Sequence, residues 1–515
     1  MKHQKVLITS ILTFLAFSLT GCQFFGSSGN EGGNTKPEGT LSLDIYASND
    51  FHGAVEYSSS SMGIELFGTY MKMKGEEENT LLLDQGDTWQ GSIYSNYNHG
   101  AMITEVMAAA HFDARTVGNH DFDWGIEPLK ANTRRSYKGY TVPTLAANVY
   151  DYDFDNKIEG NIQQSDIGVS SIISTLENGL KVGVVGIIGQ HQITSITTTN
   201  VKDVCFKEHI SIIKQEATSL REKGADIVIA SCHTGQEDLM YNGLENYIDL
   251  ALCGHTHQAQ QGREGNLHYA QFGSYGEMIG KVHLDYNTKT KKVTNTQISE
   301  IYTNEVATYA KEIDADIANI VSTYNSECEA AASEVVATNA DYFPTSDEAV
   351  NLMCKAIFDQ CEIENQDVIF SYCNTARHYL PQTYSNRPWT YATLYQSFPF
   401  DNIVYIIDVT GSDIVREVYR YNNVCFNPTF NYQIDPNETY RIACIDYLAY
   451  HTNDYRVFDY FPSFSGQAVD QLDDNYRVIL KNWLIRNGYN SGRYLYASDF
   501  SSSNDSFNKN LFQNI

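Results

Sequence analysis

The sequence predicts a large α/β domain with a mostly parallel sheet, followed by a smaller α+β domain. Three observations support this fold class. Strand-like apolar runs alternate with helical patterns as far as about Ile301, which is the order of βαβ units. The pattern then changes character at Ser333. The 515 residues also exceed the roughly 250–300 that one hydrophobic core usually serves.

The first predicted elements alternate between strand and helix. Leu41–Asn49 alternates apolar and polar side chains as a strand does, and Thr80–Asp84 is an apolar strand. Gly63–Gly75 and Gly100–Phe112 have helical periodicity. A further short strand ends at Gly118. This order predicts βαβ units that form a mostly parallel sheet.

The rest of the first domain repeats the same alternation. Phe206–Lys223 is an amphipathic helix with a single apolar stripe. The predicted strands around it are Lys181–Ile188, Asp226–Ser231 and Ile248–Cys253, and the antiparallel strands of Tyr269–Asp285 and Lys292–Ile301 complete the domain.

One long helix, Asn304–Ala332, is predicted to connect the two domains, because the segment is helical in pattern and poor in Gly and Pro. The second domain is predicted from a helix and three strands: Asp347–Cys361, Asp367–Ser371, Ile403–Val409 and Tyr440–Tyr447. The expected boundaries are residues 41–302 for the first domain, 303–332 for the linker helix and 333–515 for the second domain.

The amino terminus has the layout of an export signal. Lys2 and Lys5 precede the apolar run Val6–Leu19, which is too short for a comfortable membrane span. The run ends in Leu19-Thr20-Gly21-Cys22, which resembles the lipobox of bacterial lipoproteins. We therefore expect residues 1–22 to be a lipoprotein signal, residues 23–40 a flexible tether, and Cys22 a lipid anchor to the extracytoplasmic face of the cell membrane. The alternative is a cleaved secretory peptide with an incidental cysteine.

Charge and cysteine content exclude two classes of protein. A formal net charge of −28 and a pI near 4.8 argue against a nucleic-acid polymer as partner, although a small anionic substrate remains compatible. Apart from Cys22, nine of the 10 cysteines remain, an odd number without a CxxC pair, so no disulfide framework is expected.

Hard oxygen and imidazole groups gather where the predicted strands end. Seven such residues come from five separate segments, and none is a thiolate: Asp50, His52, Asp87, Asn119, His233, His255 and His257. This donor set suits two divalent ions such as Mn, Zn, Co or Fe, with the Asp87 carboxylate as the bridge. His99 and His111 lie away from the strand ends and are expected to be structural.

A histidine and a carboxylate accompany this set. His120 follows Asn119, and Asp123, three residues further on, can fix the tautomer of its imidazole and keep it cationic. The pair is therefore a candidate catalytic dyad. The nucleophile is expected to be a metal-bridging hydroxide, since metal ions lower the pKa of bound water and no GxSxG elbow occurs.

Five motifs resemble the blocks of calcineurin-like metallophosphoesterases, specifically the bacterial 5′-nucleotidase family. In order, they are Asn49-Asp50-Phe51-His52-Gly53, Gly86-Asp87-Thr88-Trp89-Gln90-Gly91, Gly118-Asn119-His120-Asp121-Phe122-Asp123, Ser231-Cys232-His233-Thr234-Gly235 and Gly254-His255-Thr256-His257. The resemblance implies a two-layer α/β sandwich followed by a substrate-binding domain. It also implies that Asp50, His52, Asp87 and His257 hold one ion, that Asp87, Asn119, His233 and His255 hold the other, and that His120 and Asp123 are the dyad.

The same resemblance implies a nucleotide site in the second domain. The family grips phosphate with an arginine from a glycine-rich loop, and here that loop is Asn374-Thr375-Ala376-Arg377, shorter and without glycine. The family also sandwiches the base between two aromatic rings; the second falls on Tyr447, and the first on Phe426 or Phe430. Asn453 stands in the stretch that is glycine-rich in the family.

These observations predict a dinuclear-metal phosphohydrolase that releases phosphate from nucleoside 5′-monophosphates for salvage. Two alternatives stay open at this point. One is a phosphodiesterase that acts on 2′,3′-cyclic nucleotides or another exported phosphoester. The other is a surface-binding lipoprotein that kept the fold and lost activity, although all seven candidate ligands are present. The sequence does not fix the oligomeric state.

Overall fold

The computed structural model describes residues 39–374, 376, 380–381, 383, 387–417, 423–426, 434–452 and 458–507. Four residues with predicted roles, Cys22, Arg377, Phe430 and Asn453, lie outside the described residues, as do the predicted signal and nearly all of the tether. Phe426 ends a described strand, but its side chain is also outside the described set. The predicted roles of these five residues stay predictions.

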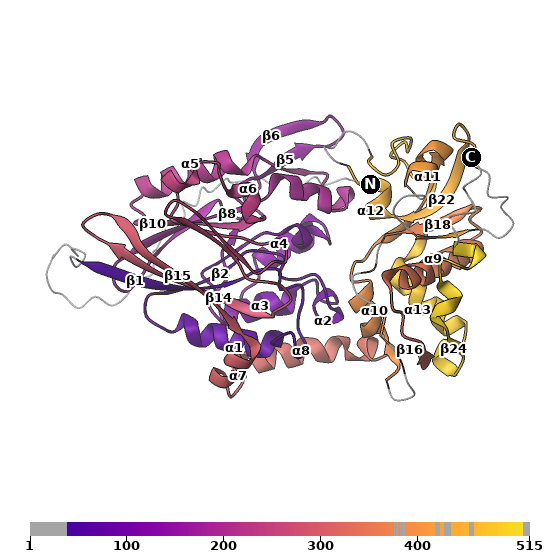
Figure 1. The fold of residues 1–515 in the computed structure, drawn as a ribbon, viewed down its shortest axis with the longest axis horizontal. Helices are drawn as coiled ribbons and strands as arrows, with labels where there is room; N and C mark the ends of the chain where they lie inside the picture. Colours follow the sequence, from indigo (N-terminus) through magenta and orange to yellow (C-terminus); the bar gives the residue numbers. More distant parts are fainter. Residues whose placement is uncertain are drawn as a thin grey trace, which may run out of the picture. The chain divides into compact units, whose positions relative to one another are not determined.

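Two six-stranded sheets form the amino-terminal half (Figure 1). The first has the order β15-β14-β1-β2-β3-β4 and is parallel from β1 to β4, with β14 and β15 antiparallel at its edge. Its strands are β1 Thr40–Ser48, β2 Thr80–Asp84, β3 Ala114–Thr116, β4 Thr144–Leu145, β14 Met278–Asn287 and β15 Lys292–Tyr302.

The second sheet has the order β12-β13-β11-β10-β8-β7. Its four central strands are parallel, and both edge strands are antiparallel to their neighbours. Its strands are β7 Ser171–Thr175, β8 Lys181–Ile188, β10 Ile227–His233, β11 Leu250–Leu252, β12 Gln260–Glu264 and β13 Leu267–Gln271.

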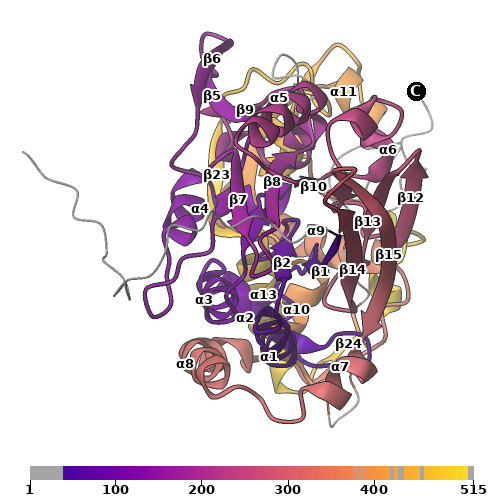
Figure 2. The ribbon, with the colours of Figure 1, turned by 90° about the vertical axis from the view of Figure 1, so that its left-hand side faces the viewer.

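Alternation along the strands makes a layered sandwich, because successive side chains point to opposite faces of a sheet. Leu43 and Ile45 of β1 pack into one cluster with Val182 and Val184 of β8, so these faces meet. Tyr46, on the other face of β1, packs with residues of the helical layer. Figure 2 shows the two layers of helices: α1 Gly63–Gly75, α3 Ala101–Ala109 and α8 Ala315–Ala332 on one side, and α5 His209–Glu222 on the other. The predicted two-sheet α/β sandwich is confirmed.

The connector between the halves is not the single long helix that the sequence predicts. It consists of α7 Thr303–Tyr309 and α8 Ala315–Ala332, separated at Asp314. The Asp314 carboxylate accepts hydrogen bonds from the first free N–H groups of α8, at Asp316 and Ile317, and so caps a new helix. Its other oxygen is 2.8 Å from Lys72 Nζ of α1. This tertiary contact fixes the break, and a helical sequence pattern does not reveal it.

The carboxy-terminal half has a five-stranded sheet of order β21-β18-β22-β20-β23. Its strands are β18 Phe370–Cys373, β20 Ile403–Thr410, β21 Asn423–Phe426, β22 Thr439–Ile445 and β23 Asp470–Asn475. The predicted strand Tyr440–Tyr447 is therefore too long, because the chain turns into helix α12 Asp446–Tyr450.

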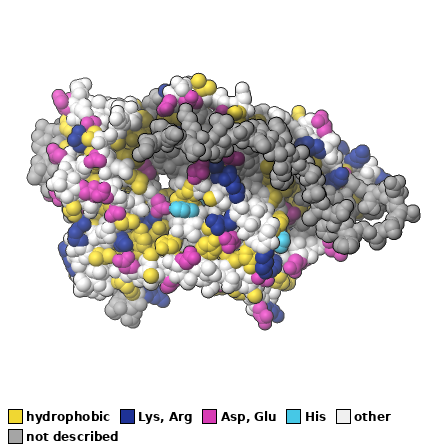
Figure 3. All heavy atoms as spheres, turned by 180° about the vertical axis from the view of Figure 1, so that it is seen from behind, with side chains coloured by type: hydrophobic (Ala, Val, Ile, Leu, Met, Phe, Trp, Pro, Cys, Tyr) yellow, Lys and Arg dark blue, Asp and Glu magenta, His cyan; other side chains and the backbone are white. Residues whose placement is uncertain are grey.

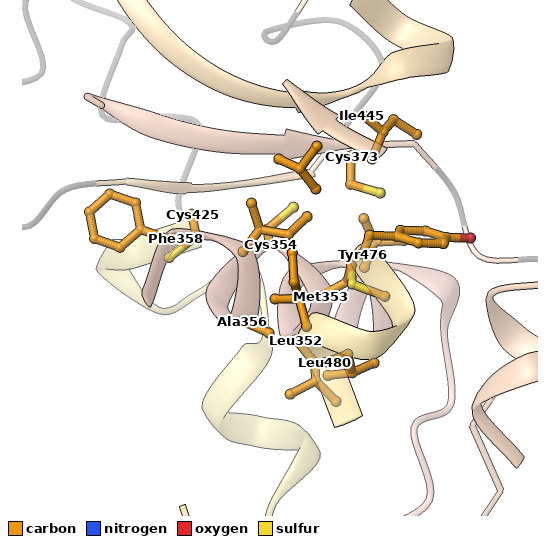
Figure 4. Packing of buried hydrophobic residues seen from close by; sticks show 14 of the residues in the cluster. Leu352, Met353, Cys354, Ala356, Phe358, Cys373, Cys425, Ile445, Tyr476 and Leu480 are labelled. Atoms are coloured by element: carbon orange, nitrogen blue, oxygen red, sulfur yellow. The ribbon is translucent and has the colours of Figure 1, made fainter. Parts of the chain in front are cut away.

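Two helices, α9 Ser346–Ile363 and α13 Tyr476–Arg486, build the core of this half. Figure 4 shows Met353 and Cys354 of α9 between Cys373 and Ile445 of the sheet and Leu480 of α13. The nine cysteines in the described part of the chain are all buried, and none of them forms a disulfide.

Shorter elements complete the fold. A small sheet has the order β6-β5-β9, and two strand pairs join distant parts of the carboxy-terminal half. The strands are β5 Val149–Asp153, β6 Ile158–Gln163, β9 Val204–Phe206, β16 Val335–Ala337 with β19 Trp389–Thr390, and β17 Asn339–Ala340 with β24 Tyr494–Leu495. The short helices are α2 Ile93–Asn96, α4 Ile126–Thr133, α6 Gln236–Leu239, α10 Tyr391–Ser397 and α11 Gly411–Glu417.

Surface and helix composition complete the description. Figure 3 shows one face, on which Asp and Glu side chains are scattered among hydrophobic and basic ones. Among the helices of the described residues, none combines the length and the apolar character that a membrane span requires.

Candidate metal centre

The seven predicted ligands meet at the carboxyl ends of the parallel strands. Each follows or ends a strand of one of the two sheets: Asp50 and His52 after β1, Asp87 after β2, Asn119 after β3, His233 at the end of β10, and His255 and His257 after β11. Side chains at this edge of neighbouring parallel strands converge, which is where open α/β sheets bind ligands. The structure therefore brings all seven residues to one place.

The backbone at this place is unusually bent. Five of the seven residues have positive φ angles, between 48° and 75°: Asp50, His52, Asp87, His255 and His257. The left-handed conformation costs a non-glycine residue about 1–2 kcal/mol. Such strain persists where the surrounding structure enforces it, and it is concentrated at functional sites.

Two glycines allow the loops after β2 and β3 to approach each other closely. A Cβ atom added at Gly86, which has φ +91°, would lie 2.6 Å from the backbone nitrogen of Gly118. A Cβ atom added at Gly118 would lie 2.2 Å from Oδ1 of Asp87. These contacts explain why both motifs begin with glycine.

The first group of candidate ligands is Asp50, His52 and His257. The two Nε2 atoms of His52 and His257 face each other at 3.0 Å, and His257 Nε2 is 3.5 Å from Asp50 Oδ1. His52 Nδ1 lies 3.0 Å from the carbonyl oxygen of Gln90, to which it donates. In the neutral ring the proton is therefore on Nδ1 and the lone pair on Nε2, the arrangement that metal-ligating histidines use.

The second group is Asp87, His233 and His255, with Asn119 between the two rings. His233 Nδ1 donates to the carbonyl oxygen of Gln85 at 2.7 Å, so its Nε2 faces Asp87 Oδ2 at 3.2 Å. Asn119 Oδ1 is 3.0 Å from His233 Nε2 and 2.9 Å from His255 Nδ1.

Asp87 lies between the two groups, because its Oδ2 is also 3.7 Å from His52 Nε2. Imidazole nitrogens and carboxylate oxygens therefore converge in a buried site. Such a donor set fits two divalent cations. The neighbouring thiols of Cys232 and Cys253 are fully buried, which raises their pKa values, so they stay protonated as apolar fillers.

Electrostatics at the site also call for added positive charge. Burial raises the pKa of Asp50 to about 7, with His233 opposing the shift and Asp87 adding to it. Burial also acts to raise the pKa of Asp87, but His233 and His120 outweigh it and hold that pKa well below its usual range. Two buried carboxylates this close are both ionised at neutral pH only if cations compensate them.

The predicted dyad is formed. His120 Nδ1 is 2.9 Å from Asp123 Oδ2, and the backbone N–H of His120 donates to Asp87 Oδ1 at 2.7 Å. The carboxylate thus holds a proton on Nδ1 and fixes the orientation of the imidazole.

Sequence reasoning missed a buried ion pair that supports these loops. Arg115 and Asp121 are each 1% exposed, and Arg115 Nη2 is 2.5 Å from Asp121 Oδ2. The same Oδ2 accepts from the N–H of Gly118 at 2.8 Å, while the guanidinium lies 3.9 Å from the centre of a Trp89 ring. Asp121 lies inside the third motif, three residues after Gly118, from whose N–H it accepts a hydrogen bond. This spacing is the sequence signal from which the role of Asp121 could have been predicted.

A cleft of about 1100 Å³ opens beside the metal ligands and the dyad. Residues of both halves line it, including the predicted substrate contacts Asn374 and Tyr447. His99 lines it too, with its ring centre 5.2 Å from that of Trp124. None of the described lining residues is Lys or Arg. The Arg377 and Asn453 contacts and the Phe426 ring fall outside the described residues.

The family model of calcineurin-like phosphoesterases matches residues 44–259. Endonuclease YhcR of Bacillus subtilis is 23% identical over 443 residues, which cover 79% of this chain and 35% of that protein. The human 5′-nucleotidase is 28% identical over 232 residues, covering 42% of this chain and 38% of that protein. This chain thus spans about a third to a half of the length of the curated relatives it matches.

Two solved structures share the fold over most of the chain. A putative 5′-nucleotidase from Staphylococcus aureus has a TM-score of 0.68 at 17% identity, covering 88% of this chain and 99% of that one. The 5′-nucleotidase precursor from Thermus thermophilus has a TM-score of 0.67 at 16% identity, covering 87% of this chain and 97% of that one. The fold is therefore the one that the motifs predict.

Proposed function

We propose that this chain, which belongs to the calcineurin-like phosphoesterases through residues 44–259, hydrolyses nucleoside 5′-monophosphates with two divalent metal ions. One observation carries the proposal. Two groups of candidate ligands share Asp87 at the edge of a large cleft, and a His–Asp dyad stands beside them. Paired cations about 3.5–4 Å apart are the usual means of displacing a phosphoester oxygen.

Two sets of residues around Asp87 would each hold one ion. The residues that would hold one ion are Asp50, His52, Asp87 and His257, and those that would hold the other are Asp87, Asn119, His233 and His255. When bound, the ions would neutralise phosphate charge and lower the pKa of water. The backbone hydrogen bonds to His52 and His233 keep both rings oriented for this task.

His120 serves the leaving group in this proposal. Asp123 accepts a hydrogen bond from Nδ1–H, which stabilises the cationic ring, and Nε2 gives its proton to the leaving 5′ oxygen. The phosphorus–oxygen ester bond breaks while the oxygen of one water molecule bonds to phosphorus. A proton from that water then replaces the one that His120 gave, so the products are a nucleoside and inorganic phosphate.

Two features support a nucleotide as substrate. Tyr447 and Asn374 line the same cleft as the metal ligands, and the Tyr447 ring contacts those of His451 and Tyr460, at 5.1 and 6.3 Å between ring centres. A fixed aromatic face suits a nucleobase, whose stacking contributes about 1–3 kcal/mol. The relatives named 5′-nucleotidase support the same choice, and release of nucleosides for salvage follows from it.

We also propose that Cys22 is lipidated and holds the chain on the outer side of the cell membrane. The apolar run and lipobox-like end of residues 6–22 support this proposal. Labelling with a fatty-acid analogue in bacteria tests it. The parent should take up label and fractionate with membranes, and Cys22→Ala should do neither; equal labelling of both would contradict it.

Phosphate release from a panel of substrates tests the activity. Metal-stripped protein should be inactive, and Mn, Zn or Co should restore hydrolysis of AMP and related monophosphates. Asp87→Asn should abolish release from every substrate, while the exposed Asp155→Asn serves as the matched control. Cleavage of bis-nitrophenyl phosphate, a cyclic nucleotide or an oligonucleotide without release from AMP would overturn the proposal in favour of a phosphodiesterase.

A further inference from the structure

A loop of the carboxy-terminal half, residues 398–402, lies against the dyad of the amino-terminal half. The Phe400 ring stacks on the His120 imidazole, with ring centres 5.3 Å apart and an interplanar angle of 29°. Both residues line the cleft. The face of the imidazole is therefore covered by a side chain that is remote in the sequence.

This loop is held firmly by its own half. Arg477 is fully buried and donates through Nη1 to the carbonyl oxygens of Phe398 and Phe400, at 2.7 and 2.5 Å. Its Nη2 pairs with the Asp401 carboxylate, and its guanidinium lies 3.3 Å from the centre of the Tyr395 ring. Three contacts from one buried cation fix the backbone on both sides of the Phe400 ring.

The amino-terminal half holds the same loop from the other side. The side-chain amides of Gln90 and Asn96 both donate to the carbonyl oxygen of Pro399, at 2.9 and 2.8 Å. Trp124 Nε1 donates to Asp401 Oδ2 at 3.0 Å. The residues flanking Phe400 are thus tied to the half that contains the dyad, and the ring is built into its position.

We propose that Phe400 is a positioning residue for His120. The hydrogen bond to Asp123 and the edge contact with the His52 ring, at 5.3 Å between ring centres, hold the edges of the imidazole, and Phe400 covers its face. The stacked Phe400 ring restricts rotation of the imidazole and so keeps Nε2 directed at the position of the leaving oxygen. The inference rests on the proposed phosphohydrolase activity, and it gives the carboxy-terminal half a part in leaving-group departure as well as in binding.

Leaving groups of different basicity test this inference. AMP departs as an alkoxide that needs a proton, whereas p-nitrophenyl phosphate departs as a stable phenolate. Phe400→Ala should lower kcat for AMP about 10- to 100-fold, as a misplaced catalytic group does, and change kcat for p-nitrophenyl phosphate by less than about threefold. Phe400→Tyr keeps the flat ring and should restore the parent ratio. His120→Ala/Phe400→Ala should be no slower on AMP than His120→Ala alone.

A matched control separates positioning from general damage. Tyr405 lines the same cleft and contacts Tyr450 instead of the dyad, so Tyr405→Leu should keep the parent ratio of the two kcat values. Circular dichroism verifies that each variant is folded. The inference is overturned, while the proposed function stands, if Phe400→Ala lowers kcat equally for both substrates or only raises KM. If His120→Ala itself does not distinguish the substrates, the proposed role of the dyad fails first.

Discussion

The buried pair of Arg115 and Asp121 gives a prediction whose size follows from the structure. Both side chains are 1% exposed, so removing one partner leaves an uncompensated buried charge. Breaking such a pair costs about 3–5 kcal/mol, whereas replacing both partners by apolar groups is close to neutral. Asp121→Leu and Arg115→Met should therefore each lower the free energy of unfolding by about 3–5 kcal/mol.

The double variant Arg115→Met/Asp121→Leu should lose much less free energy of unfolding than the two single variants lose together. Its remaining cost comes from the N–H groups of Gly118 and Thr88, which donate to the Asp121 carboxylate at 2.8 and 3.4 Å. An unsatisfied buried N–H costs about 1–3 kcal/mol, so the double variant should lose about 2–6 kcal/mol of its free energy of unfolding, where additivity predicts a loss of about 6–10.

Urea unfolding with EDTA present, followed by tryptophan fluorescence, measures this cycle without a contribution from bound metal. Arg134→Met is the matched control, because the Arg134 side chain is 63% exposed in its pair with Asp166. This variant should lose less than about 1 kcal/mol of the free energy of unfolding. The reasoning would be refuted if the single variants unfold with a free energy within about 1 kcal/mol of the parent's, or if the loss in the double variant equals the sum of the two single losses.

Two further predictions concern pH and substrate binding. Burial raises the pKa of Asp113 to about 6, above its value of 3.8 in the unfolded chain, so ionising it destabilises the fold as the pH rises from about 4 to 6. Asp113→Asn should therefore raise the free energy of unfolding at pH 7 by at most about 3 kcal/mol, with a smaller gain at pH 4; a gain that does not depend on pH in urea titrations would contradict this. Tyr447→Ala should raise KM for AMP by about 5- to 150-fold while kcat changes little, because one stacking face is worth about 1–3 kcal/mol; steady-state kinetics that show a fall in kcat alone would count against a base contact.

Local signals account for the parts of the fold that the sequence predicts well. The predicted bounds Gly63–Gly75, Thr80–Asp84 and Lys181–Ile188 coincide with α1, β2 and β8, because periodicity and flanking glycines define these elements. The candidate ligands were predictable for a related reason. The carboxyl ends of parallel strands share one edge of a sheet, so polar residues that end such strands meet whatever the intervening chain does.

Contacts between distant segments account for what the sequence does not predict. The ion pair of Lys72 and Asp314 lies at the break in the connector helix, and no local sequence pattern in either segment predicts this pair. The stacking of Phe400 on His120 joins two halves whose patterns are each complete without it. Similarly, the sequence gives no sign that Arg115, a charged residue in a short strand, is buried. Periodicity reports which face of an element is buried and carries no information about its partner.

Metal stoichiometry tests the central claim most directly. Elemental analysis of protein refilled with Mn should find two ions per chain, and electron paramagnetic resonance should show them as a coupled pair through the shared Asp87 carboxylate. Asp87→Asn should lose at least one ion and the coupling, whereas the control Asp155→Asn should keep both. A parent chain that binds one ion or none, or an Asp87→Asn variant that binds the same coupled pair, would contradict the account.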